Sequence, residues 1–312
     1  MRLFKDVTKF DFMGKRQIAM VLSLVLILAS AASFLTQGLK LGIDFTGGTL
    51  IELGYSQPAD VEKIRSTLVG AGFEDSTVQH FGTNKDVLIR LAPDEETSSA
   101  ELSNQVIKLL SAEETDKVDL RRVEFVGPQV GDELTNDGGL AMLYALFFIL
   151  IYVGFRFEYR FALGSILALV HDVIITVGIF SIFQIEFDLP VLAAVLAVIG
   201  YSLNDTIVVY DRIRENFRKI RKGSPAEVIN TSLNQTLSRT MITSLTTIMV
   251  LLALFIFGGE IIHGFAFALL IGVAIGTYSS MYVASASVLM LGISKADLMP
   301  VKKEGAEIDD NP

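Results

Sequence analysis

The chain has 312 residues, of which 51% are apolar, and its formal net charge is -9. Long apolar runs without charge alternate with short charged connections, which is typical of a protein that crosses a membrane several times. The absence of cysteine excludes a disulfide framework and thiolate metal sites. The three histidines lie far apart in the sequence, no phosphate-binding loop motif is present, and the acidic balance argues against nucleic acid as a partner. We therefore expect no metal, no bound cofactor and no enzymatic catalysis.

Six segments are apolar enough to span a bilayer, which takes about 20 residues. They are residues 17–36, 139–155, 161–183, 189–210, 240–257 and 264–291. The first follows a basic segment and contains Ala29-Ser30-Ala31, which resembles the cleavage site of a signal peptide. Because its apolar stretch is longer than the about 7–15 residues of a signal peptide, we favour a retained span and keep cleavage as the alternative.

Lysine and arginine beside the spans predict the orientation, because these residues gather on the cytoplasmic side. With residues 1–16 in the cytoplasm, the inside segments carry five, two, seven and three cations. The short outside loops 184–188 and 258–263 carry none. This asymmetry predicts that both ends, including the tail 292–312, are cytoplasmic and that residues 37–138 form one large domain outside.

Residues 37–138 have the pattern of a compact α+β domain. Their predicted order is strand 49–55, helix 58–70, hairpin strands 77–81 and 87–91, helix 97–110 and strand 118–126. The order βαββαβ predicts a ferredoxin-like fold. The chain enters this domain through Asp44-Phe45-Thr46-Gly47-Gly48, where paired glycines are suited to a tight turn.

The cytoplasmic segment 211–239 between the fourth and fifth spans is basic. Asp211–Lys222 is expected to extend span four, and Ser224 with Glu227 forms a capping-box motif that begins a second helix. That helix has an apolar stripe, so we expect a connector that lies along the membrane surface and turns into span five at Arg239.

A carboxylate within a span marks a functional site by default, because it costs about 2.5–3.5 kcal/mol at the helix centre. Asp205 lies in span four, and Arg239 begins span five on the same cytoplasmic side. Arginine stays charged in almost any environment, whereas protonation of a carboxylate follows its surroundings. The two residues therefore predict a proton switch, with Asn204 among the groups that supply hydrogen bonds. The alternative is a static ion pair that fixes helix packing.

Span three carries a second carboxylate, Asp172, for which two roles remain open. It is either a further member of a proton relay or a hydrogen-bonding group that holds the bundle together. In span six, Gly272, Gly276, Ser280 and Ala284 recur every four residues. Small residues at this spacing predict a face for close helix packing.

Several short motifs occur in a fixed order along the chain. They are Asp44–Gly48, Val123–Pro128, Gly154–Glu158, His171–Thr176, Ile199–Lys219, Gln235–Thr240, and Gly264-Phe265 followed by Gly272 and Gly276. Taken together, this set resembles the SecD/SecF family of bacterial protein-export membrane proteins, part of the RND transporter superfamily. The resemblance covers essentially the whole chain apart from the extreme N-terminus and the tail after about residue 295.

The resemblance implies a multi-pass subunit of the bacterial inner membrane that pairs with a SecD-like subunit beside the SecYEG channel and small accessory membrane proteins. Such a complex uses the proton-motive force to drive late steps in the export of unfolded polypeptides, and Asp205 and Arg239 match its proton-path positions. Two alternatives stay open: half of an RND-type small-molecule exporter, and a non-transporting scaffold of the channel. A single outer domain of this size leaves little room for a drug pocket, and proton coupling would discriminate against the scaffold.

Overall fold

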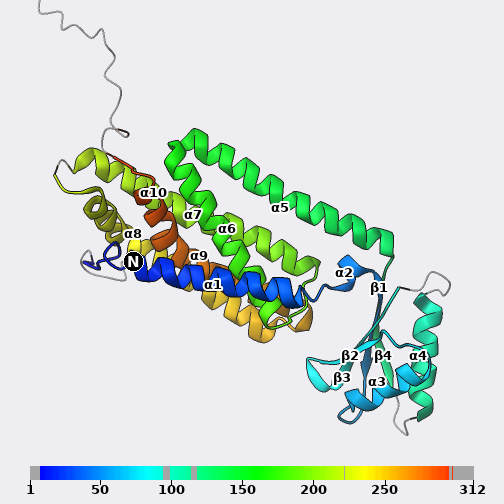
Figure 1. Cartoon of the computed structure of the whole chain (residues 1–312). Coiled ribbons are helices and arrows are strands. Elements are labelled where there is room, and N and C mark those ends of the chain that lie inside the picture. The colour runs from blue at the N-terminus through cyan, green and yellow to red at the C-terminus, as the bar shows by residue number, and fades with distance from the viewer. Residues whose placement is uncertain (1–7, 94–98, 114–117, 221, 295–296, 298–312) are drawn as a thin grey trace, which may run out of the picture.

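The molecule is an elongated helical bundle with a small sheet at one end (Figure 1). This computed structural model describes residues 8–93, 99–113, 118–220, 222–294 and 297. The first seven residues of the predicted N-terminal segment, the start of the predicted helix 97–110 and residues 298–312 of the predicted tail lie outside the described residues. The start of α1 (Arg16–Gln37) and α10 (Ser285–Met290) lie at the end of the bundle away from the sheet.

Six helical segments are long and apolar enough to cross a membrane, which confirms the predicted number of spans. They are α1, α5 (Pro128–Arg156), α6 (Tyr159–Ile182), α7 (Leu189–Lys219), α8 (Pro225–Phe257) and the segment Ile261–Met290. The last segment contains α9 (Glu260–Ser279), the π-helical segment η1 (Ser280–Ala284) and α10. The chain is therefore a multi-pass membrane protein.

Two helices extend beyond the apolar runs from which the spans were predicted. Helix α5 begins at Pro128, well before the predicted start of the second span, because proline suits the first position of a helix and polar residues continue it outside the apolar run. Helix α8 runs without a break, so the predicted turn at Arg239 does not exist. No glycine or proline lies between Ala226 and Phe257 to end it.

One face of the first half of α8 packs against the rest of the protein, so its apolar stripe contacts the core. Its capping box is present, with both Ser224 and Glu227 bonded as expected. Asn234 then accepts a hydrogen bond from the backbone N–H of Phe10 at 2.8 Å, and Asn230 accepts one from Phe12 at 2.7 Å. The apolar stripe formed by Ile229, Leu233 and Leu237 is buried in the main core. Helix α7 before it ends at Lys219, three residues earlier than predicted.

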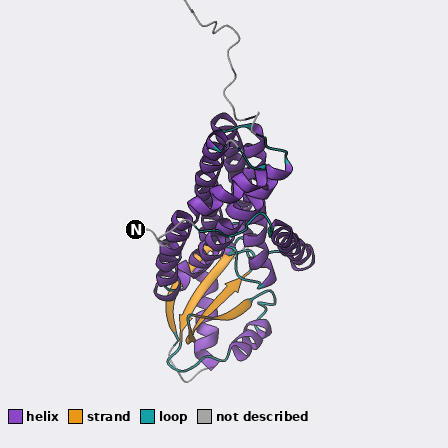
Figure 2. Cartoon of the chain, turned by 90° about the vertical axis from the view of Figure 1, so that its left-hand side faces the viewer, coloured by secondary structure: helices purple, strands orange, loops and turns teal. Residues whose placement is uncertain are grey.

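The sheet domain contains β1 (Gly48–Gly54), α3 (Val61–Gly70), β2 (Thr77–Phe81), β3 (Thr83–Leu91), α4 (Ser99–Glu113) and β4 (Asp119–Val126). All paired strands are antiparallel, and their order across the sheet is β2-β3-β1-β4. The sheet and the helices near it are seen in Figure 2. Side chains of α3 and α4 share one hydrophobic core with the sheet. Strand β3 begins four residues earlier than predicted, so the hairpin turns at Gly82, where φ is 74°.

A short segment joins the sheet to the bundle. Helix α2 (Ile43–Thr46) is followed by Gly47 and Gly48, both with positive φ, and a Cβ on Gly48 would lie 2.5 Å from the carbonyl oxygen of Leu91. Asp44 accepts a hydrogen bond at 2.8 Å from the backbone N–H of Leu189 at the start of α7. The sequence predicted a tight turn at the two glycines. The structure shows in addition that Gly48 lets its backbone lie close to the backbone of Leu91, where a side chain would not fit.

Candidate functional site

Asp205 lies in the buried interior of the bundle. Helix α7 packs between α8 and α9, which leaves Asp205 only 3% exposed. The hydroxyl of Ser244 on α8 lies 3.4 Å from its Oδ2. The hydroxyls of Ser244 and Thr277 are 2.7 Å apart, and Thr277 donates to the carbonyl oxygen of Val273 on α9. With one long contact to a hydroxyl, this carboxylate has little stabilisation as an anion.

Arg239 and Asn204 do not contact the carboxylate of Asp205. Both residues are exposed on the surface of the bundle, and no ion pair between Arg239 and Asp205 occurs among the residues that the structure describes. Ser244 follows Arg239 on α8 by five residues, which is about 7.5 Å along the helix axis. The structure therefore places Arg239 on the helix that Asp205 faces, about one and a half turns before Ser244. The static ion pair is not present in this conformation.

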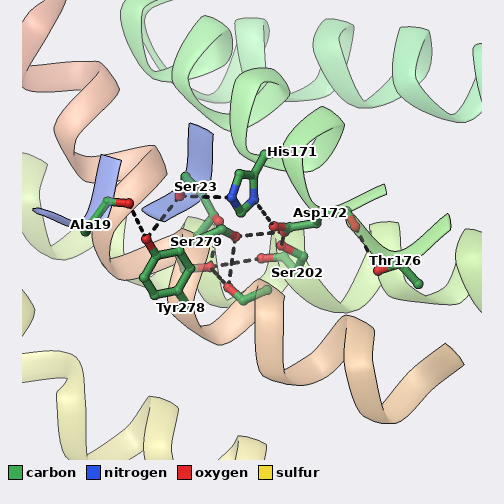
Figure 3. A network of polar contacts seen from close by, with 11 residues as sticks. Ala19, Ser23, His171, Asp172, Thr176, Ser202, Tyr278 and Ser279 are labelled. Atoms are coloured by element: carbon green, nitrogen blue, oxygen red, sulfur yellow. Dashed lines mark hydrogen bonds and ion pairs between the residues drawn. The ribbon is translucent and has the colours of Figure 1, made fainter. Parts of the chain in front are cut away.

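Asp172 is the centre of a second buried polar cluster, in the middle of α6 (Figure 3). Its Oδ2 accepts hydrogen bonds from Ser202 on α7 at 2.5 Å and from Ser279 on α9 at 2.7 Å. Its Oδ1 lies 2.8 Å from Nδ1 of His171. Side chains from three helices thus converge on one carboxylate that is 1% exposed.

Sequence reasoning missed the imidazole side of this cluster. Nε2 of His171 lies 3.1 Å from the hydroxyl of Ser23 on α1, which lies 3.0 Å from the hydroxyl of Tyr278 on α9. Tyr278 donates to the backbone carbonyl oxygen of Ala19 at 2.6 Å. The adjacent His-Asp pair within a span was the available signal, because two polar residues at that depth require partners. Its partners lie 148 and 107 positions away in the chain, so the sequence did not show them.

The small residues of the last span pack against α7 of the same chain. A Cβ on Gly272 would lie 2.1 Å from Val198, and one on Gly276 would lie 3.0 Å from Ser202. The other two small residues, Ser280 and Ala284, lie in the π-helical segment. Ser280 bonds the hydroxyl of Thr206 at 2.9 Å, and the carbonyl oxygen of Ala284 accepts from Tyr210 at 3.2 Å. These contacts lie within one chain, so this face requires no partner subunit.

Models of two protein families match the chain. The model described as the C-terminal region of the protein export membrane proteins SecD/SecF matches residues 105–294. The model of the SecD/SecF GG motif matches residues 32–59, which include α2 and the two glycines after it. The fold and these matches define a membrane protein of the SecD/SecF protein-export class.

Relatives named protein translocase subunit SecF match almost the full length. The relative from Vibrio alginolyticus is 55% identical, over 100% of this chain and 99% of its own. Those from Pseudomonas aeruginosa and Escherichia coli O157:H7 are 52% and 50% identical, covering 97% and 96% of this chain and 97% and 93% of theirs. The chain belongs to the SecF family of protein translocase subunits.

A solved structure extends the comparison to three dimensions. The crystal structure of SecDF from Thermus thermophilus, a translocon-associated membrane protein, has a TM-score of 0.83 at 39% identity over 93% of this chain. The chain spans 39% of the length of that SecDF protein. SecDF in a form called super-membrane-facing has a TM-score of 0.69 over the same share. The structure described here is thus more similar to the first form than to the second.

Proposed function

We propose that the chain couples proton movement to late steps of protein export across the bacterial inner membrane, as one subunit of a larger complex. The observation that carries the proposal is Asp205, a buried carboxylate within a membrane span, with one long hydroxyl contact and with no cation bonded to it among the described residues. An anion there lacks the solvation that water provides, so a proton stabilises the group in this conformation. Transport rather than catalysis agrees with the names of the relatives.

Arg239 supplies the second state of the proposed switch. Its guanidinium is exposed, and its long side chain starts about 7.5 Å from Ser244 along α8. Movement of the arginine toward Asp205 would stabilise the carboxylate and release its proton, and withdrawal would favour proton uptake. Asn204, next to Asp205 and exposed, offers amide hydrogen bonds to water or to a partner along the proton path.

The partner that we propose is a SecD-like subunit, which supplies the other half of the proton path. Transporters of this kind build their path between paired repeats, and six spans form only one of the two halves. Asn204 is exposed near the centre of a span, and its amide requires hydrogen-bond partners that lipid does not provide. The SecYEG channel, small accessory membrane proteins and unfolded exported polypeptides complete the proposed assembly.

The proposed orientation places both chain ends in the cytoplasm and the sheet domain outside, as a ferredoxin-like periplasmic unit. The cation asymmetry supports it, because the two short loops at the sheet end carry no lysine or arginine. The start of α1 and the end of α10 share the opposite end of the bundle, in agreement with an even number of spans.

The test is the substitution Asp205→Asn, which removes the titrating group and keeps its shape. We expect it to abolish proton-dependent late export, measured as release of a secreted protein from spheroplasts, while the protein accumulates normally. Asp211→Asn is the matched control, because this carboxylate lies on the same helix but is half exposed and pairs with Arg156. Normal export and proton flux in Asp205→Asn would overturn the proposal. Export that continues while efflux of small solutes fails would favour the exporter alternative.

A further inference from the structure

The hydroxyls around His171 fix the direction of each hydrogen bond in the cluster of Figure 3. A hydroxyl has one hydrogen to donate. Tyr278 gives its hydrogen to the carbonyl oxygen of Ala19, so the contact between Tyr278 and Ser23 must use the hydrogen of Ser23. Ser23 then has none left for His171, so their 3.1 Å contact must use a hydrogen on Nε2.

The contact on the other side of the imidazole also requires a hydrogen. With a hydrogen on Nε2, the 2.8 Å contact between Nδ1 of His171 and Oδ1 of Asp172 still needs a hydrogen of its own. It comes either from a doubly protonated imidazole or from a protonated carboxyl group. A hydrogen on the other carboxylate oxygen, Oδ2, would not lie between Nδ1 and Oδ1, and Oδ2 already accepts from the hydroxyl of Ser202 at 2.5 Å. A neutral histidine beside an ionised aspartate leaves one contact without a hydrogen.

We propose that the His171–Asp172 pair is a proton-binding site, separate from Asp205, and that it holds one proton in this structure. The bound proton makes the pair electrically neutral, which suits its depth, since both side chains are almost fully buried at the middle of a membrane span. Asp205 is not part of this cluster, because its hydroxyl partner lies on α8, whereas the partners of the pair lie on α1, α7 and α9.

Few charged groups compete with the pair for this proton. Helices α1 and α10, which pack against α6, have no aspartate, glutamate, lysine or histidine within their spans, and Arg16 lies at the start of α1. The remaining helices against α6 contribute the following titratable side chains along their spans: Tyr144 and Tyr152 on α5, Tyr201, Asp205 and Tyr210 on α7, His263 and Tyr278 on α9, and Tyr282 on η1. The charged residues of α5 lie in its first ten residues and at Arg156, and those of α7 other than Asp205 lie from Asp211 onward. Among these, only Tyr278 reaches the cluster, through Ser23.

The proton holds α1 against α6 and α9. Without it, either the contact from His171 to Ser23 or that from Ser23 to Tyr278 loses its hydrogen, and the buried pair gains a negative charge. Helix α1 leads directly through α2 to the first strand of the sheet domain. Occupancy of the pair is thereby linked to the helix that leads into the outer domain. This link to the outer domain rests on the proposed proton coupling. The presence of a proton on the His171–Asp172 pair rests on the hydrogen bonds alone.

The test is nitrogen magnetic resonance on the full chain with its partner in lipid nanodiscs, labelled with ¹⁵N-histidine. The variants His80→Gln and His263→Gln leave His171 as the only histidine. Near neutral pH we expect Nε2 to carry a hydrogen, together with either a protonated Nδ1 or an infrared band of a protonated carboxyl group that Asp172→Asn abolishes. An unprotonated Nε2 beside an ionised carboxylate would overturn the proposal.

A matched pair of variants tests the role of the α1 hydroxyl. Ser23→Ala removes the acceptor for Nε2, so the pair should bind its proton about tenfold more weakly, the loss expected for one hydrogen bond to a charged group. Ser33→Ala removes a different hydroxyl contact between α1 and α6, 2.8 Å to Ser181, and should leave proton binding unchanged. Equal proton affinity in Ser23→Ala and the unsubstituted protein would contradict the proposal.

The variant Asp205→Asn separates this inference from the proposed function. The His171 resonances should be the same in this variant as in the unsubstituted protein, because Asp205 bonds to Ser244 and not to the pair. Export by Asp205→Asn therefore tests the proposed function, while the state of His171 tests the proton site. A change of His171 protonation in Asp205→Asn would contradict a separate site and indicate one coupled cluster.

Discussion

At the scale of single residues, the sequence identified the two carboxylates within the spans but not the side chains that bond to them. Asp205 and Asp172 were predicted as candidates because a carboxylate within an apolar run stands out in the sequence. The sequence did not show that Asp205 meets Ser244, or that Asp172 meets His171, Ser202 and Ser279. These partners come from other helices, and only the packing of the helices brings them together.

Arg239 provides a prediction at this scale. Arg239→Lys should reduce late export severalfold although the charge is kept, because an ammonium is shorter in reach, more strongly hydrated and lacks the planar fork that matches a carboxylate. The measurement is release of a secreted protein at a fixed membrane potential. Arg212→Lys is the control, since Arg212 is an arginine on the adjacent helix α7 that pairs with Glu215 at 2.9 Å. Full export by Arg239→Lys would show that only a positive charge is needed.

Asp188, in the loop before α7, predicts a pH dependence of stability. Burial raises the pKa of Asp188 from 3.8 to about 6, and the nearby carboxylates Glu186 and Asp44 act in the same direction. The folded state therefore binds this proton more tightly than the unfolded chain does. The stabilisation is complete below the unfolded pKa and is lost as the pH rises through about 6.

Asp188→Asn should remove this loss while keeping a capping oxygen for the backbone N–H of Val191. The variant should melt at a higher temperature than the unsubstituted protein at about pH 7, and the difference should shrink toward about pH 4. Thermal unfolding in detergent at both pH values measures it. Asp60→Asn, an exposed helix cap on α3, is the control for the cap itself. A difference independent of pH would contradict the assignment to Asp188.

At the scale of elements, apolar periodicity located every span but not every helix end. Helix α5 continues beyond its apolar run to Pro128, and α8 continues past Arg239, because helix formation does not require apolar residues where the chain has no breaker. The π-helical turn at Ser280–Ala284 had no signal in the sequence. It lies where the last span packs against α6 and α7, so tertiary packing accounts for it better than local propensity does.

The contact between α7 and α9 predicts a packing effect. Gly272→Ala places a Cβ 2.1 Å from a methyl group of Val198, so the two helices must separate. We expect destabilisation of about 1–3 kcal/mol, the usual cost of overpacking, measured by thermal unfolding. Val198→Ala in the same chain should restore part of the loss, since it removes the methyl groups that clash. Gly154→Ala on α5 has open space and should be close to neutral. Absence of rescue by Val198→Ala would contradict this packing account.

At the scale of the whole molecule, one face of the bundle is covered by α1, whereas another exposes polar side chains. Helix α1 packs on α6, whereas α7 and α8 present Asn204 and Arg239 at the surface. The sequence predicted six spans and one βαββαβ unit between the first two, because periodicity and charge are local properties. How the bundle sits against the sheet depends on contacts such as Asp44 to Leu189, which join residues 145 positions apart.

The exposed polar face predicts where the partner binds. Asn204→Cys should form disulfide crosslinks to cysteines in the fourth span of a SecD-like subunit, without background because the chain contains no cysteine. Leu22→Cys on α1, a side chain that is half exposed on another helix, should give none. Crosslinking in cells that contain both subunits makes this measurement. Crosslinks from Asn204→Cys only to a second copy of the chain would contradict the heterodimer and favour a homo-oligomer.

The central claim is that Asp205 carries protons while the complex moves polypeptides. Proton uptake into proteoliposomes that contain the full complex, followed with a pH-sensitive dye under an imposed membrane potential, tests it most directly. Each charge that crosses provides about 2.3 kcal/mol per 100 mV, and that energy needs a titrating group at which to enter. We expect uptake in the unsubstituted complex and in Asp211→Asn, and none above the level of empty liposomes in Asp205→Asn. Equal uptake with and without the Asp205 carboxylate would contradict the account.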